Sequence, residues 1–469
     1  MDIGGIALKR SGKQDLCQGP ILSGMFFYAL PLIATGVLQT LYNSADTAVI
    51  GRFAGDISLA AVTSTSHFIN LLVNLFMGLS TGILTVVAKH IGAKHSDAVR
   101  KSVHTAVPLA LICGIFLLVA GLISSKPVLV LMNTGGGNAE VLNKAVLYTR
   151  IYFLGTPAFL LYNFCASILR AAGDTKRPLV YLTISGVLNV LLNLLFVIVF
   201  HMDVAGVALA TIISQYVSAV LVVLRLQKET GDIHFSFAAM RIDRRQMSEM
   251  LRIGVPSGIQ SSMFSIANVV IRSTVNTFDY LYVAGVGAAN QIENLMYTIL
   301  TALYTATLAF TSQNFGAKNV DRIRKVLWRG HLLNILSYLV IVPLLLIFSR
   351  QLLGLFTTNP VSIEAGRTVM ILLMGSVFID GAMNVQVGHL RGLGYSFGPL
   401  INAMLGSCGL RIVWMIVIFP ALGSTWEALY LCYPVTWAVT FAAHAVYTVF
   451  ADRILNKIES PKDGNPASV

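Results

Sequence analysis

Long apolar stretches separated by short polar segments dominate this chain of 469 residues. A helix needs roughly 20 apolar residues to cross about 30 Å of hydrocarbon, and stretches of that length recur throughout. We therefore expect an all-α polytopic membrane protein with twelve transmembrane helices. They are predicted at residues 24–50, 57–88, 103–124, 145–169, 178–200, 204–225, 253–278, 282–313, 327–348, 367–390, 399–420 and 428–450.

The second half of this pattern repeats the first. The segment Gly92-Ala-Lys-His-Ser-Asp-Ala-Val-Arg-Lys returns as Gly316-Ala-Lys-Asn-Val-Asp-Arg-Ile-Arg-Lys, and each copy lies between two long apolar helices. Pro31 and Pro256 precede the copies at nearly the same distance, and a Leu-Arg-x-x-Gly segment follows each copy. The repeat predicts two six-helix lobes related by a pseudo-two-fold axis along the membrane normal. Secondary transporters are built from halves of this kind, which rock against each other.

The longest polar connector divides the two halves and sets the expected domain boundaries. These are a cytoplasmic N-terminus at 1–23, an N-lobe at 24–225, a cytoplasmic linker at 226–252, a C-lobe at 253–451 and a cytoplasmic tail at 452–469.

Composition and charge agree with a membrane protein. Only 12% of the residues are charged, against about 25% in soluble domains. The net charge of +12 comes from basic residues in alternate loops, and the positive-inside rule places both termini and both Gly-Ala-Lys loops in the cytoplasm. Topology and anionic lipid explain this charge better than nucleic acid does. We expect a multi-pass protein of the bacterial inner (cell) membrane that is a monomer in the lipid bilayer and binds no nucleic acid.

Several classes of protein lack support in the sequence. The five cysteines are scattered without Cys-x-x-Cys spacing, which argues against a disulfide or metal framework. There is no P-loop, and the N-terminus lacks the pattern of a removable signal peptide. No nucleophile–base pair or His-rich metal motif occurs at useful spacing, so we do not expect an enzyme.

Three acids fall well inside the predicted spans, and such residues are costly and usually functional. Asp46 shares a helical face with Gln39, Asn43 and Thr47, which together form a polar stripe. Its carboxylate could hold a proton, or Na⁺ if neighbouring oxygens complete the shell. The alternative is a structural acid that only bonds its neighbours. Candidate partners are Asn189, Asn193 and Thr211, although membrane asparagines often serve only to hold helices together.

The second half holds the other two acids. Glu293 has a plausible ion-pair partner in Arg272, and structural pairing and substrate recognition are equally open. Asp380, with Asn384 one turn later, is a second candidate for proton or cation handling unless Arg411 pairs with it.

The two halves share the order of their helices and motifs, but the polar residues of the first half are not repeated in the second. Alignment on the two prolines sets Ile271 opposite Asp46, and alignment on the Leu-Arg segments sets Trp414 opposite Asn193. Such asymmetry is expected of an ion-coupling site in one lobe. Polar, methionine and aromatic side chains could line an adaptable substrate cavity, although each one is more often core or lipid-facing. The candidates are Gln39, Tyr42, Met263, Phe264 and Tyr297.

Taken in order, the motifs resemble the multidrug and toxic compound extrusion (MATE) transporters, in particular their bacterial DNA-damage-inducible-type branch. The resemblance covers roughly residues 20–450 and rests on Leu41-Tyr-Asn-Ser-Ala-Asp46, Leu169-Arg-Ala-Ala-Gly-Asp-Thr-Lys-Arg-Pro178, Ile253-Gly-Val-Pro256, Gln313-Asn-Phe-Gly-Ala-Lys318 and Leu390-Arg-Gly-Leu-Gly394. It implies twelve helices in two V-shaped lobes and cation-coupled drug export.

The resemblance also implies roles for single residues. It sets the coupling acid at Asp46, with Asn189 and Thr211 beside it, while Asn193 replaces a carboxylate that some members carry. Asp380 matches an acid of sodium-coupled relatives, whereas the segment around Gln260 lacks their helix-seven glutamate.

These observations predict an antiporter that exports amphiphilic, often cationic small molecules by alternating access, with H⁺ or Na⁺ as its coupling ion. No cofactor is expected, and no metal beyond a possible Na⁺ at Asp46. The main alternative is a flippase for lipid-linked sugars, which would be expected to have a more cationic cavity; only Arg272 and Arg411 qualify. A channel is disfavoured by the doubled, asymmetric halves.

Overall fold

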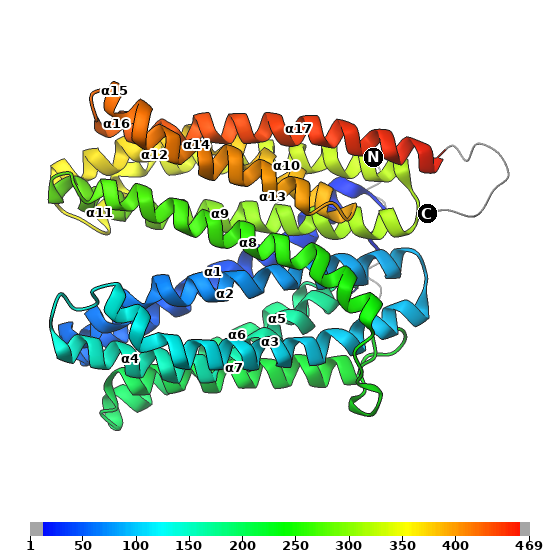
Figure 1. Ribbon diagram of the computed structural model, residues 1–469, viewed down its shortest axis with the longest axis horizontal. Coiled ribbons are helices and arrows are strands. Elements are labelled where there is room, and N and C mark those ends of the chain that lie inside the picture. Colours follow the sequence, from blue (N-terminus) through cyan, green and yellow to red (C-terminus); the bar gives the residue numbers. More distant parts are fainter. Residues whose placement is uncertain (1–12, 460–469) are drawn as a thin grey trace, which may run out of the picture. The chain divides into compact units, whose positions relative to one another are not determined.

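The structure is a computed structural model that describes residues 13–459, and the secondary structure within that range is entirely helical (Figure 1). The predicted N-terminus (1–23) and tail (452–469) therefore lie partly outside the described residues. The first half contains α1 (Ile21–Phe53), α2 (Gly55–Gly92), α3 (Ser96–Leu131), α4 (Ala139–Leu154), α5 (Thr156–Ala171), α6 (Lys176–Leu194), the π-helical η1 (Leu195–Val199), α7 (Asp203–Gln227) and the short η2 (Phe237–Ala239).

Within the described residues, the second half has five long helices, and between the fourth and the fifth of them a helical stretch changes type along its length. Its elements are α8 (Arg244–Val275), α9 (Tyr280–Gly316), α10 (Val320–Ile347), α11 (Ser349–Gly354), α12 (Pro360–Gly392), α13 (Phe397–Ala403), η3 (Met404–Gly409), α14 (Leu410–Val413), η4 (Trp414–Ile418), α15 (Phe419–Ala421), α16 (Trp426–Tyr430) and α17 (Cys432–Glu459). Both η3 and η4 are π-helical.

The helices account for the predicted spans. Among the described residues, 10 helical stretches are long and apolar enough to cross a membrane, and α4 with α5 forms an eleventh, bent by 44°. The one remaining predicted span, 253–278, lies in α8, which is long enough at 32 residues but more polar than the other long helices. Its first turns come from the predicted linker, because the Asp243 carboxylate accepts hydrogen bonds from the backbone N–H of Arg245 and Gln246 and starts the helix there.

The chain folds into two compact units, and α1 and α8 each contribute to both. The border in α1 falls beside Pro31 and the border in α8 falls beside Pro256, the two prolines of the sequence repeat. The first unit holds the N-terminal segment to Gly19, Leu30–Ile91 and His95–Gly254; the second holds Pro20–Ala29, Gly92–Lys94 and the chain from Val255 onward.

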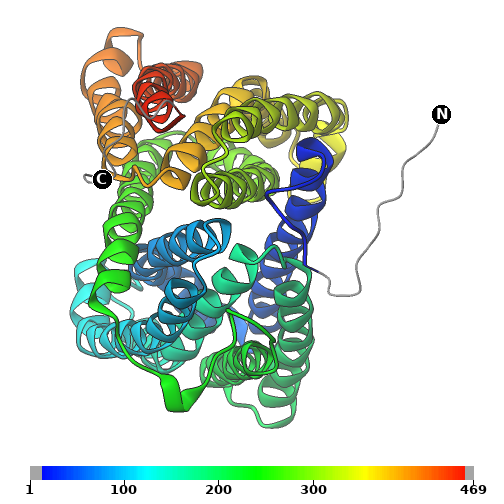
Figure 2. The ribbon, with the colours of Figure 1, turned by 90° about the vertical axis from the view of Figure 1, so that its right-hand side faces the viewer.

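One helix lies at the centre of each unit. In the first unit α5 packs between α3 and α7, and most of its residues are buried. In the second unit α12 packs against α9, α10 and α17, as Figure 2 shows. The Leu-Arg segments of the repeat close these two central helices, so the repeated sequence marks the same structural position in both units.

The repeated Gly-Ala-Lys segments form the same turn. Lys94 and Lys318 both have positive φ, at 55° and 56°, a left-handed conformation that is uncommon for a residue with a side chain. The residue after each lysine donates its N–H to a carbonyl five residues earlier: His95 to His90 (3.1 Å) and Asn319 to Asn314 (3.0 Å). The duplication read from the sequence is thus present in the backbone.

The Leu-Arg-x-x-Gly segments also match. Gly173 and Gly394 end their helices at φ 82° and 93°, where glycine is favoured. In each copy the N–H after the glycine bonds the leucine carbonyl at 2.9 Å: Asp174 to Leu169 and Tyr395 to Leu390.

Candidate functional site

Asp46 lies within α1 and contacts the polar side chains predicted on the neighbouring helices. Asn193 of α6 donates from Nδ2 to Asp46 Oδ1 at 2.5 Å and to Asn189 Oδ1 at 3.3 Å. Asn189 in turn donates to Thr211 Oγ1 on α7 at 3.4 Å. The structure therefore brings together four of the predicted ion-coupling residues, from three helices, in one hydrogen-bonded chain.

This Asp46 site lacks a compensating cation. Among the described residues, no lysine, arginine or histidine forms an ion pair with Asp46. Asn193 is fully buried, and its Oδ1 has no hydrogen-bond partner. The carboxyl group of Asp46 and an unsatisfied amide oxygen therefore lie side by side, an arrangement that a bound proton or small cation would stabilise.

The other predicted residues of α1 lie outside this network. Gln39 and Asn43 are exposed, and neither side chain joins the hydrogen-bonded chain of Asp46 among the described residues. Tyr42 is half-buried and donates to the Thr183 carbonyl of α6 at 3.4 Å, with its ring against Gly186. Tyr42 therefore packs α1 on α6 next to the Asp46 site.

The second unit has a polar cluster of its own, built from different residues. Asp380 on α12 is 3% exposed; its Oδ1 accepts from Asn384 Nδ2 at 3.3 Å, while its Oδ2 has no partner. Glu293 is buried on α9, but the predicted pair with Arg272 is wrong. Arg272 is exposed on α8, and no ion pair joins these two described residues. The reason is that consecutive helices need not turn the required faces toward each other.

Arg411 lies near these acids without forming an ion pair to Asp380. It is 3% exposed on α14, donates from Nη1 to Asn268 Oδ1 at 3.2 Å and from Nε to Thr436 Oγ1 at 3.4 Å. Its guanidinium carbon lies 4.3 Å from the centre of the Tyr433 ring. Sequence spacing could not reveal this set of contacts, because its members lie on three different helices.

Gln260 has an unexpected partner. Its Oε1 accepts a 2.8 Å hydrogen bond from Nη2 of Arg391, the arginine of the second Leu-Arg segment, whose Nη1 donates to the Tyr304 hydroxyl at 2.8 Å. Gln260 therefore links α8 to the end of α12. The remaining cavity candidates, Met263, Phe264 and Tyr297, are half-buried in the second unit, where Phe264 packs on the apolar core.

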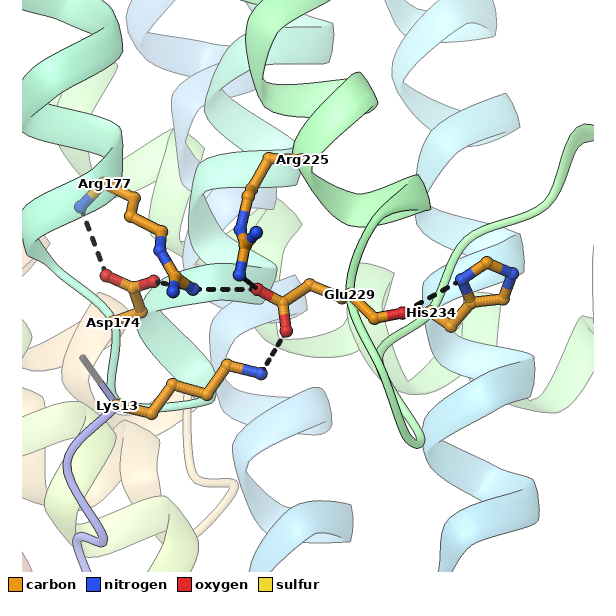
Figure 3. Close-up of polar contacts among 6 residues, drawn as sticks. All are labelled: Lys13, Asp174, Arg177, Arg225, Glu229 and His234. Carbon is orange, nitrogen blue, oxygen red and sulfur yellow. Dashed lines mark hydrogen bonds and ion pairs between the residues drawn. The ribbon is translucent and has the colours of Figure 1, made fainter. Parts of the chain in front are cut away.

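A further polar cluster lies at one end of the first unit (Figure 3). We call it the Glu229 cluster. Glu229, whose side chain is only 3% exposed, pairs with Arg177 (2.8 Å), Arg225 (2.5 Å) and Lys13. Its remaining members are Asp174, which pairs with Arg177 at 2.9 Å, and His234, whose Nδ1 lies 3.2 Å from the Glu229 carbonyl. Lys13 joins the segment before α1 to this end of the unit.

The MatE family profile matches residues 31–195 and 256–417, so the two matches begin at the two repeated prolines. The chain belongs to the MATE family. It is a multi-pass membrane transporter of that family.

Relatives of known sequence support this placement. The chain is 27% identical to the probable multidrug resistance protein YoeA of Bacillus subtilis, over 83% of this chain and 85% of that protein. It is 25% identical to a FAD transporter of Shewanella oneidensis, over 88% and 90%. A solved MATE structure in the bent conformation, 20% identical, matches the fold with a TM-score of 0.87 over 95% of this chain and 98% of that one.

Proposed function

We propose that the protein exports amphiphilic, cationic organic compounds in exchange for H⁺ or Na⁺ that binds at Asp46. The observation that carries this proposal is the half-buried carboxylate of Asp46 beside the unsatisfied Oδ1 of Asn193, with no ion-pair partner among the described residues. An uncompensated charge inside a membrane helix is costly, and a proton or Na⁺ supplied by the membrane gradient would neutralise it.

Coupling would follow from competition between conformations. If the cation and the drug favour different states of an alternating-access cycle, each promotes release of the other, since a ligand shifts an equilibrium only by its differential affinity. We propose that the protein works as a monomer in the bacterial cell membrane, with both termini in the cytoplasm and no cofactor besides the coupling cation. The basic residues of the Gly-Ala-Lys turns support this orientation.

The names of the relatives support drug efflux over the flippase alternative. Two of the matched Bacillus subtilis proteins are named probable multidrug resistance proteins. The Shewanella oneidensis relative is named a FAD transporter, which makes a flavin nucleotide the informative second substrate to test beside organic cations.

The test is export into everted membrane vesicles with a proton gradient and a sodium gradient imposed separately. Wild type should accumulate a cationic dye under one of them. Asp46→Asn should abolish this accumulation and keep the protein folded, because the neutral amide retains the shape but not the charge. Glu364→Gln is the control, since Glu364 is exposed and, within the described part of the chain, its ion pairs are with Arg350 and Arg367. Full gradient-driven export by Asp46→Asn would overturn the assignment.

A further inference from the structure

The buried acids of the second unit differ from Asp46 in one respect: a buried arginine lies among them. Ser407 Oγ lies 4.0 Å from Met383 Sδ, where the helical stretch that carries Arg411 runs back along α12. Arg411, one turn after Ser407, therefore lies at the level of Asp380, one turn before Met383, and its charge acts on Asp380 and on Glu293 of α9. No basic side chain among the described residues acts on Asp46 in this way. The two units therefore differ in the charge that surrounds their acids.

Arg411 is held in place by its surroundings and not by the acids. Asn268, Thr436 and the face of the Tyr433 ring together fix the guanidinium group. The four-residue α14 that carries Arg411 lies between the π-helical segments η3 and η4. Single π-turns are rare and recur at functional sites, because the added residue redirects the side chains of the helix. The local backbone thus holds Arg411 in a defined direction.

The acids themselves retain unused oxygen ligands. Asp380 Oδ2 is buried without a partner, and Asn384 uses its Nδ2, not its Oδ1, in the hydrogen bonds to Asp380. Glu293 is buried nearby and makes no ion pair among the described residues. Carboxylate and amide oxygens are the ligands that hard cations such as Na⁺ prefer. These residue types alone would make a cation site, so whether a cation binds there depends on whether another charge already neutralises the two acids.

We propose that Arg411 is the resident counter-cation of the second unit, which compensates Asp380 and Glu293 and excludes Na⁺ from them. At an effective dielectric constant of about 20, a fixed unit charge within about 10 Å of a cation site lowers the affinity of that site by at least about tenfold. The coupling cation would then bind only at Asp46. That last step rests on the proposed function, whereas exclusion of Na⁺ by Arg411 does not.

The experiment measures binding of radioactive ²²Na⁺ to the purified protein at pH 8. All variants carry Asp46→Asn, so that the first unit contributes no signal. This parent should bind no Na⁺ in the millimolar range. Adding Arg411→Met should create Na⁺ binding at least about tenfold tighter than in the parent, and adding Asp380→Asn should remove the gain. Arg411→Lys keeps the charge and should leave Na⁺ excluded.

Two results would overturn the proposal. One is Na⁺ binding by the parent that Asp380→Asn abolishes, because the arginine would then fail to exclude the ion. The other is a folded Arg411→Met protein, with a melting temperature close to that of the parent, that gains no binding. Arg411→Gln, which keeps a polar side chain toward Asn268, replaces Arg411→Met if the latter does not fold. Failure of the export assay with Asp46→Asn would leave these binding results unaffected, so the two proposals fail separately.

Discussion

Neutralising Glu229 tests whether the Glu229 cluster holds the segment before α1 in place. The side chain of Glu229 is 3% exposed, while its partners Lys13, Arg177 and Arg225 are 25%, 28% and 26% exposed. Glu229→Gln keeps the shape of the side chain and leaves three cations close together. Each of these partly exposed ion pairs contributes at most about 1 kcal/mol to stability. We therefore expect Glu229→Gln to lower the free energy of unfolding by about 2 kcal/mol, which corresponds to several degrees of melting temperature.

The readouts are thermal unfolding in detergent and the rate of tryptic cleavage after Lys13. Cleavage should accelerate, because Lys13 loses its carboxylate partner, although the hydrogen bond from Gln14 N–H to the Gly173 carbonyl (3.2 Å) remains. Glu249→Gln is the matched control: Glu249 is 29% exposed, and its pairs with Lys89 and Arg245 are longer, at 3.5 and 3.6 Å. Glu249→Gln should lower the free energy of unfolding by less than about 0.5 kcal/mol.

The dependence of protein stability on pH and salt tests whether the negative charge of Glu229 is stabilising. Burial alone would raise the pKa of Glu229, but the hydrogen bond to Lys13 and the charges of Lys13, Arg225 and Arg177 outweigh it and hold the pKa below its usual 4.5. The stabilisation is therefore complete above about pH 4.5 and is lost as the pH falls through the lower folded-state pKa. The gap between wild type and Glu229→Gln should close in acid and shrink in 1 M salt. A Glu229→Gln protein as stable as Glu249→Gln at pH 7 would refute the reasoning.

The repeat supplies matched pairs for two further tests by thermal unfolding. Gly173→Ala and Gly394→Ala both place alanine at positive φ, which should lower the free energy of unfolding by about 1 kcal/mol. Of the two, only Gly173 would also bring the new Cβ against a backbone oxygen, that of Gln14, at 2.0 Å. Gly173→Ala should therefore be clearly the more destabilising, and equal losses would contradict this. Asn138→Ala and Asn359→Ala each remove a helix N-cap that accepts a backbone N–H at 2.9 Å, so both should lose about 1 kcal/mol; a loss at one position alone would show that the caps are not equivalent.

Hydropathy predicts the helical segments well, because each must present about 30 Å of apolar surface to the membrane. It does not reveal breaks within a segment. The single helix predicted at 145–169 is instead α4 and α5, bent by 44° around Gly155 and Pro157. Proline in the first turn of a helix costs nothing, so the sequence alone fits a continuous helix and a broken one equally well. The π-helical η3 and η4 leave no periodic signal either, because a π-turn depends on packing and not on residue type.

The polar residues around Asp46 could be found from the sequence for an energetic reason. A polar side chain in an apolar helix needs a partner, so Asn193 and Thr211 were the available candidates, and the structure joins them through Asn189. The same reasoning failed for Arg411. Its partners Asn268 and Thr436 lie on two other helices, α8 and α17, and no spacing rule gives the rotation of one helix relative to another.

The two units therefore share a backbone and differ in charge. Matching turns at Lys94 and Lys318 show that the scaffold is duplicated, whereas Asp46, the half-buried acid of the first unit, lacks the arginine that accompanies the acids of the second. If both units bound the same cation, duplication would have doubled the charge carried per cycle. On the proposal that Arg411 neutralises the acids of the second unit, only the first unit would respond to a mobile cation. The asymmetry of charge, set on a symmetric scaffold, is what would let one gradient drive one substrate outward.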